Sequence, residues 1–162
     1  MYHKTDVVII GAGPVGLFAV FELGLLNLKC HLIDNLDKVG GQCAELYPEK
    51  PIFDIPSHVR ITAQELTDNL LAQAKTFDPV FHLSQQANTI EKVEDNNWLI
   101  NTSSGNSIIA RCIVIAGGAG SFVPRKPTIN DIDKYDGKSV FYSIKDKSVF
   151  NGKKVIIAGG GD

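Results

Sequence analysis

Hydrophobic residues occur along this chain in short continuous runs and in helical repeats, and the two patterns alternate over its first part. Residues 7–10 form a run of four apolar, β-branched residues, which predicts a buried strand. The apolar residues that follow recur every three or four positions and predict a helix; they are Leu17, Val20, Phe21, Leu25 and Leu26. Gly24 and Asn27 indicate the end of that helix. Residues 29–34 then predict a second strand, so the chain opens with a strand–helix–strand unit.

The later part of the chain predicts a helix, a short strand and an antiparallel meander. Thr62 and Glu65 form a capping-box signature, and Asp78-Pro79 should end the helix that follows. Its apolar face is predicted to contain Leu66, Leu70, Leu71 and Ala74. Residues 79–83 predict a strand of the parallel sheet, residues 89–93, 98–102 and 107–110 predict the meander, and residues 111–116 predict a returning buried strand. The predicted fold class is therefore α/β.

Composition and charge narrow the possible functions. The chain has 162 residues, 44% of them apolar and 21% charged, which is typical of a globular protein with a real core. A net charge of -2 gives no reason to expect nucleic acid or an anionic membrane as a partner. No apolar run is long enough to span a bilayer, and the first residues lack the apolar segment of a signal peptide, so we expect a cytoplasmic protein.

The three cysteines, Cys30, Cys43 and Cys112, are far apart in the sequence. Their spacing suggests neither a disulfide framework nor a metal site, and no histidine lies at ligand spacing from them. Cys30 and Cys112 lie in apolar strand patterns and are predicted to be small core residues.

The strongest candidate for chemistry is the glycine-rich turn between the first strand and the first helix. Gly11, Gly13 and Gly16 have the Gly-x-Gly-x-x-Gly spacing, in which the glycines permit a tight turn, close approach of a pyrophosphate and close helix–strand packing. Pro14 and Val15 complete this loop. Asp34 follows Gly11 by 23 positions, close to the spacing at which an acidic side chain meets a ribose hydroxyl. Together they predict a dinucleotide site for FAD or NAD rather than NADP, although glycine turns and strand-end aspartates also have purely structural uses.

The segment after Asp34 is rich in glycine and proline and is predicted to be irregular. With its Gly40-Gly41-Gln42, the chain resembles the two-dinucleotide-binding flavoprotein reductases that include thioredoxin reductase. The segment 47–50, Tyr-Pro-Glu-Lys, is similar to that of the thioredoxin-reductase-like ferredoxin–NADP reductases. The resemblance implies FAD in the first site, with Gly41 and Gln42 beside the flavin and the Tyr47 ring stacked on it. It also implies that Ala87 meets the adenine and that Phe122 contacts FAD. A purely structural alternative is that Tyr47 holds the loop against the domain.

The resemblance also concerns the electron acceptor. A Pro stands at position 48, where the disulfide branch of the family has the partner of Cys43, and residues 142–145 lack the Cys-x-x-Cys of thioredoxin reductase. The resemblance therefore implies hydride exchange between NADP and FAD and electron exchange with ferredoxin or flavodoxin, in a homodimer when the protein is full-length. No side chain in this chain is an evident catalytic acid or base.

Residues 152–162 repeat the opening pattern, with basic residues, an apolar run and a Gly-x-Gly. We expect an FAD-binding domain over residues 1–122, a connector over 123–136 and the start of an NADP-binding domain over 137–162, which ends inside its own glycine motif. The chain is then the N-terminal half of a reductase. Two alternatives remain open: a flavin reductase or monooxygenase with another acceptor, and a non-catalytic FAD-binding or dimerising fragment.

Overall fold

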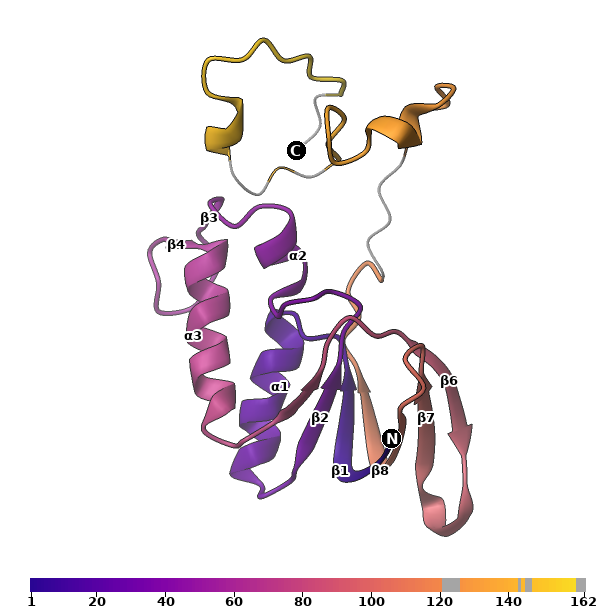
Figure 1. The fold of residues 1–162 in the computed structure, drawn as a ribbon. Helices are drawn as coiled ribbons and strands as arrows, with labels where there is room; N and C mark the ends of the chain where they lie inside the picture. The colour runs from indigo at the N-terminus through magenta and orange to yellow at the C-terminus, as the bar shows by residue number, and fades with distance from the viewer. Residues whose placement is uncertain (121–125, 143, 145–146, 160–162) are drawn as a thin grey trace. The chain divides into compact units, whose positions relative to one another are not determined.

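The computed structural model describes residues 1–120, 126–142, 144 and 147–159 (Figure 1). They fall into two units, one within Met1–Val123 and the other within Pro124–Asp162. Within the described residues, no helix is both long and apolar enough to cross a membrane.

The first unit is built on a sheet with the strand order β5-β2-β1-β8-β7-β6. Its parallel strands are β1 (Tyr2–Ile10), β2 (Cys30–Ile33), β5 (Val80–His82) and β8 (Ser107–Ile115). Helices α1 (Pro14–Leu25) and α3 (Ala63–Lys75) pack together and cover one face of the sheet (Figure 1). This arrangement confirms the predicted α/β class with a parallel sheet.

The predicted meander is also present. Strand β6 (Ala87–Lys92) leads through a 3-10 turn, η1 (Glu94–Asn96), into β7 (Trp98–Thr102), and β7 pairs with β8. Ile100 and Ile108 of the meander form one core cluster with Val8 and Ile33 of the parallel strands. The meander therefore packs on the face of the parallel sheet opposite the helices, because Val7 and Ile9, which alternate with Val8, belong to the helix-side core.

The helices follow their sequence signals closely, with differences at the ends. Thr62 and Glu65 form the predicted capping box of α3, and Leu17 and Val20 of α1 are buried as predicted. Leu25 and Leu26, the last residues of the same apolar repeat, are 59% and 69% exposed. They occupy the last helical position and its cap, where α1 ends and its apolar face no longer has the sheet beneath it.

The cysteines divide between the core and the surface. Cys30 is buried as predicted, and burial raises the pKa of its thiol to about 11. The prediction that Cys112 is a core residue is wrong, because Cys112 is exposed. Cys112 pairs in register with Val7, so it lies on the helix side of the sheet. However, α1 packs over β1 and β2, whereas β8 lies on the other side of β1 from β2.

The segment after Asp34 is more regular than predicted. Helix α2 (Gly41–Glu45) forms directly after the glycine pair, since left-handed Gly40, with φ of +115°, turns the chain into it. A two-stranded hairpin follows, β3 (Pro51–Ile52) and β4 (Ile61–Thr62), and leads into α3. The prediction of an irregular segment over residues 40–50 was therefore wrong for residues 41–45 and correct for Gly40 and for residues 46–50.

The second unit contains two 3-10 turns, η2 (Ile132–Tyr135) and η3 (Lys147–Phe150). The Lys126 ammonium bonds to Asp133 at 2.7 Å and to Asp136 at 2.8 Å, and these bonds raise its pKa. The strand expected before the second glycine motif does not form, because the described part of this unit offers it no partner strand. Its side chains Ile156 and Ile157 are 96% and 84% exposed.

Candidate functional site

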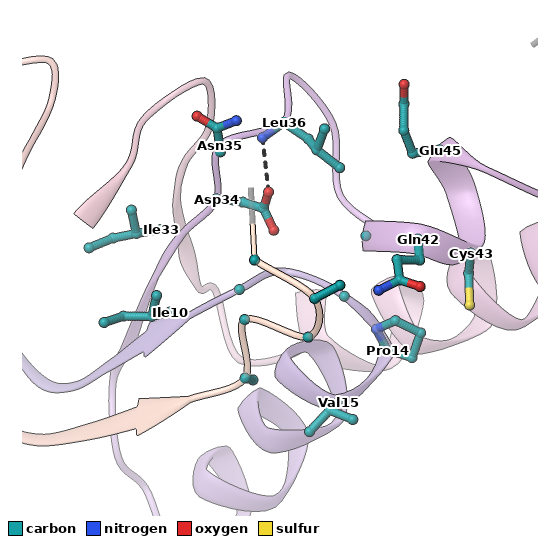
Figure 2. Close-up of a pocket in the computed structure, with 18 of the residues that line it drawn as sticks. Ile10, Pro14, Val15, Ile33, Asp34, Asn35, Leu36, Gln42, Cys43 and Glu45 are labelled. Carbon is teal, nitrogen blue, oxygen red and sulfur yellow. Dashed lines mark hydrogen bonds between the residues drawn. The ribbon is translucent and has the colours of Figure 1, made fainter. Parts of the chain in front are cut away.

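The candidate site lies where strand β1 ends, between β2 on one side and β8 on the other. The chain continues from β1 toward β2 and β5 in one direction, whereas β8 pairs with β1 from the opposite side. A crevice outside the carboxyl ends of strands at such a switch point is where doubly wound sheets bind their ligands. The structure has a cavity of about 430 Å³ at this place, within the range of small-molecule sites (Figure 2).

The glycine-rich turn forms the floor of this cavity. Gly11 has φ of +108°, and a Cβ at this position would collide with the carbonyl group of Ala116. A Cβ at Gly16 would collide with the carbonyl oxygen of Gly11. Only glycine therefore fits both positions, Gly11 because of its conformation and its neighbour, and Gly16 because of its neighbour alone.

Helix α1 begins at this turn and points its N-terminus at the cavity. Its N-cap is Gly13, which has no side chain to satisfy the first backbone N–H groups, and its first turn contains no acidic residue. The free N–H groups and the positive end of the helix dipole therefore make this edge of the cavity suited to an anion such as a pyrophosphate.

Asp34 joins the loops that follow the first two strands. Its carboxylate accepts hydrogen bonds from the backbone N–H of Ala12, at 2.6 Å, and from that of Leu36, at 2.9 Å. Figure 2 shows the second bond, with the carboxylate among the lining residues of the cavity. Each carboxylate oxygen can accept more than one hydrogen bond, so Asp34 can brace both loops and still accept from a ribose hydroxyl.

The loop before α2 packs against the glycine turn and borders the cavity there. Gly40 donates its backbone N–H to the carbonyl of Ala12 at 2.8 Å. A Cβ at Gly41 would lie 3.1 Å from the Cα of Gly13, so the two loops pack backbone against backbone. Gln42 lines the cavity, and its amide lies against Gly118 of the loop that follows β8. Three loops from three strands therefore meet at one site.

The far end of the cavity is lined by Cys43 and Tyr47. Burial raises the pKa of the Cys43 thiol above its usual range, while the hydrogen bond from Tyr47 opposes the rise. Burial and the neighbouring thiol also raise the pKa of the Tyr47 hydroxyl. Both groups are therefore protonated at neutral pH, and Cys43 is not an activated nucleophile. Cys43 and Tyr47 also line a neighbouring cavity of about 440 Å³.

The opposite end of the cavity is formed where β5 leads into β6. Backbone N–H groups of Ser84 and Gln85 donate to the carbonyls of Leu36 and Asp34, at 2.8 and 3.0 Å. These bonds hold the segment containing Gln85, Gln86 and Ala87 against the loop after β2. Main-chain groups of this segment border the cavity at Ala87, the residue for which the resemblance implies a contact with adenine.

Comparison with known proteins identifies the family of this chain. The family of pyridine nucleotide-disulphide oxidoreductases matches residues 5–162 of the chain. The chain belongs to this family. The resemblance drawn from the glycine turn, Asp34 and Gly40-Gly41-Gln42 is thereby confirmed.

Individual relatives within the pyridine nucleotide-disulphide oxidoreductase family are similar over nearly the whole chain. A protein named ferredoxin–NADP reductase from Parvibaculum lavamentivorans is 56% identical over 158 residues, 98% of this chain and 46% of its own length. One named ferredoxin–NADP reductase 1 from Christiangramia forsetii is 57% identical over 159 residues, 98% of this chain and 45% of its length. The chain therefore spans about half the length of these relatives.

One solved structure has an architecture similar to that of this chain. Thioredoxin reductase from Lactococcus lactis matches with a TM-score of 0.63 and 25% identity, covering 82% of this chain and 40% of that protein. The parallel sheet with its helix layer is therefore an arrangement shared with this thioredoxin reductase.

The structure brings most of the predicted site residues together. Nine line the cavity: Gly11, Gly13, Pro14, Val15, Asp34, Gly41, Gln42, Tyr47 and Ala87. Gly16 lies behind the turn and supports it, and Phe122 lies outside the described residues. We did not predict the other residues that line the cavity, which are Ile10, Ile33, Asn35, Leu36, Cys43, Glu45, Leu46, Gln85, Gln86 and Ala116 to Gly120. Their only sequence signal was their position directly after a predicted strand or beside a predicted site residue.

Proposed function

We propose that the whole protein is an FAD-containing ferredoxin–NADP reductase and that this chain supplies its FAD site. The observation that supports this most strongly is the cavity built by the Gly11 turn, Asp34 and the Gly41-Gln42 loop. The absence of any Cβ at Gly13 and Gly41 leaves room for the backbone to reach a pyrophosphate. The names and identities of the relatives, 56% and 57%, supply the reaction type.

The residues of this chain have distinct roles toward FAD. The N-terminus of α1 neutralises the pyrophosphate, Asp34 accepts from the ribose, and main-chain groups at Ala87 meet the adenine. Gln42 and Tyr47 lie at the flavin end, where the Tyr47 ring offers a flat face for stacking, and Phe122 is a further contact. When bound, FAD would supply the hydride and single-electron chemistry, and this chain would supply its binding and orientation.

The partners follow from the same proposal. Ferredoxin is the expected electron partner, with flavodoxin as an equivalent one, and NADP binds to the domain that begins at the second glycine motif. The full-length protein is a cytoplasmic homodimer. The net charge of -2 gives no support for nucleic acid or a membrane surface as a partner.

Two measurements test this function. The purified 162-residue chain, saturated with FAD and desalted, should retain flavin absorbance near one equivalent. The full-length protein should reduce ferredoxin with NADPH and should not reduce a protein disulfide. A chain that retains no flavin would contradict the FAD site, whereas disulfide reduction without ferredoxin reduction would contradict the acceptor alone.

A second function, reduction of a different acceptor by the same architecture, has one observation in its favour. The fold is shared with thioredoxin reductase, whose acceptor is a protein disulfide. Against it, Cys30, Cys43 and Cys112 are all free thiols, and Tyr142 to Lys145 contain no cysteine. A non-catalytic FAD-binding or dimerising role would be indicated if the full-length protein bound FAD but was not reduced by NADPH.

A further inference from the structure

Three histidines that are far apart in the sequence meet on the sheet of the first unit. His3 lies on β1, His31 on β2 and His82 on β5. Nδ1 of His31 and Nε2 of His82 are 3.0 Å apart, and the His3 ring centre lies 5.5 Å from that of His31 and 4.8 Å from that of His82. One ring nitrogen from each of the three side chains lies within 4.8 Å of the other two.

The fold explains why these rings converge. His31 alternates with Cys30 and Leu32 of the helix-side core, so its ring projects from the opposite face, which is the face that the meander covers. His82 alternates with Phe81 in the same way. His3 pairs in register with Ile108, a residue of the meander-side core, and therefore reaches the other two rings from the meander side. The three rings therefore meet on the meander side of the parallel strands.

The surroundings of His31 and His82 favour the neutral form of these two rings. His82 is only 6% exposed, and burial lowers its pKa. Burial, together with repulsion from His82 and His3, lowers the pKa of His31 to about 4. At neutral pH His31 and His82 are therefore uncharged, and a neutral imidazole has a lone pair to donate.

We propose that His3, His31 and His82 form a binding site for a divalent transition-metal ion, with Zn²⁺ as its occupant. Zn²⁺ binds imidazole nitrogen at about 2.0–2.1 Å in a tetrahedron, which places ligand nitrogens roughly 3.4 Å apart. The three nitrogens lie within 4.8 Å of one another, so small rotations of the rings bring them to that spacing. Three nitrogen ligands leave a fourth position for water and suit zinc better than magnesium or calcium.

The bound ion would connect parts of the sheet that do not pair directly with each other. It would link the N-terminal half of β1 to the edge strand β5. The carbonyl of His82 accepts a hydrogen bond from the backbone N–H of Asp34 at 3.0 Å, so the ion would also hold the wall of the nucleotide cavity. This site is separate from the proposed FAD site and does not depend on the proposed function.

A metal titration tests the site directly. The chain, treated with a chelator and in a background with Cys43→Ser and Cys112→Ser, is titrated with Zn²⁺ by calorimetry and with Co²⁺ by visible absorption. We expect one ion per chain and a raised Tm in Zn²⁺. His3→Gln and His82→Gln should each weaken Zn²⁺ binding at least about 100-fold, since loss of only a supporting partner of a ligand costs 10–100-fold. His58→Gln is the matched control, because His58 is exposed and lies outside the cluster, and it should leave binding unchanged.

Circular dichroism and the Tm without metal show whether each variant folds. His3 is only partly buried near the start of its strand, so His3→Gln tests the site even if His82→Gln unfolds the chain. Zn²⁺ binding that is equally strong in the folded His3→Gln variant and in its parent would overturn the proposal. Failure of the parent to bind Zn²⁺ would do the same.

Discussion

The two glycine motifs of this chain have similar sequences and different structures. In the first, Val8 and Ile9 are completely buried in the strand that precedes the turn. In the second, Ile156 and Ile157 are 96% and 84% exposed, and no strand forms. Gly11 and Gly159 nevertheless share a φ of +108°. The turn conformation is therefore encoded locally, whereas the strand depends on partners.

The partners of the first motif explain the difference. Strand β1 pairs with β2 through residues 7–10 and with β8 on its other side, so both of its backbone edges are satisfied. The side chains of the strand then fill two cores, one under the helices and one under the meander. The described part of the second unit supplies neither a neighbouring strand nor a covering layer.

The largest expected effect comes from removing an apolar side chain of the first strand. Ile9→Ala should lower the free energy of unfolding by about 2–5 kcal/mol, because it leaves a cavity in a closed core. Ile157→Ala, at the matching position of the second motif, should change it by less than about 0.5 kcal/mol. Urea denaturation of both variants measures the difference. Equal losses would show that the second motif is also packed.

The turn glycines give the next test. Gly11→Ala should abolish FAD retention and destabilise the chain by about 1–3 kcal/mol, since it adds a clash with Ala116 to an unfavourable φ. A Cβ at Gly159 meets no atom within 4 Å, so Gly159→Ala should leave FAD retention and the cooperative transition of the first unit unchanged. Flavin absorbance after desalting and thermal unfolding followed by circular dichroism measure both effects. Loss of FAD in Gly159→Ala would contradict the separation of the two motifs.

The same contrast shows what the sequence could predict. The period of the apolar residues and the caps predicted α1, α3 and the parallel strands, because these signals are local. The Gly11 turn with Asp34 predicted the nucleotide site, since their spacing reflects a recurrent strand–helix–strand geometry. The second apolar run carried an equally clear strand signal and failed, because pattern alone cannot show whether a partner is present.

Other features could not be predicted because they depend on distant parts of the chain. His3 is 28 residues from His31, and His31 is 51 residues from His82. The pairing of β2 with β5 brings His31 and His82 together, and the sheet then brings His3 of β1 to them. Cys112 was placed in the core because its strand is apolar, but the sequence does not show which strand α1 covers.

A smaller effect is expected at the acidic residue of the first motif. Asp34→Ala removes two hydrogen bonds to backbone N–H groups and the acceptor for the ribose, so FAD affinity should fall about 10–100-fold. Asp37→Ala is the matched control, because Asp37 is an exposed acid of the same loop, and it should leave the affinity unchanged. Fluorescence titration with FAD gives both dissociation constants. Equal affinities for Asp34→Ala and the parent chain would remove Asp34 from the site.

The smallest expected effect concerns how helices begin in the two units. Thr62→Ala removes the capping box of α3 and should cost about 1 kcal/mol of stability at pH 7, with Thr62→Ser restoring most of it. Hydrogen bonds from Thr62 lower the pKa of Glu65 in the folded chain. The Glu65 carboxylate therefore stabilises the fold at pH values above its pKa in the unfolded chain. This stabilisation is lost as the pH falls through the pKa of Glu65 in the folded chain. The difference between Thr62→Ala and the parent should therefore shrink below about pH 4. Asp131→Asn, at the start of η2, removes no side-chain cap and keeps a residue type that tolerates the left-handed φ of +63°, so it should change stability by less than about 0.5 kcal/mol at either pH. Urea denaturation at pH 7 and below about pH 4 measures these differences in stability. A cost of Thr62→Ala that does not change with pH would show that the Glu65 carboxylate does not contribute to the cap.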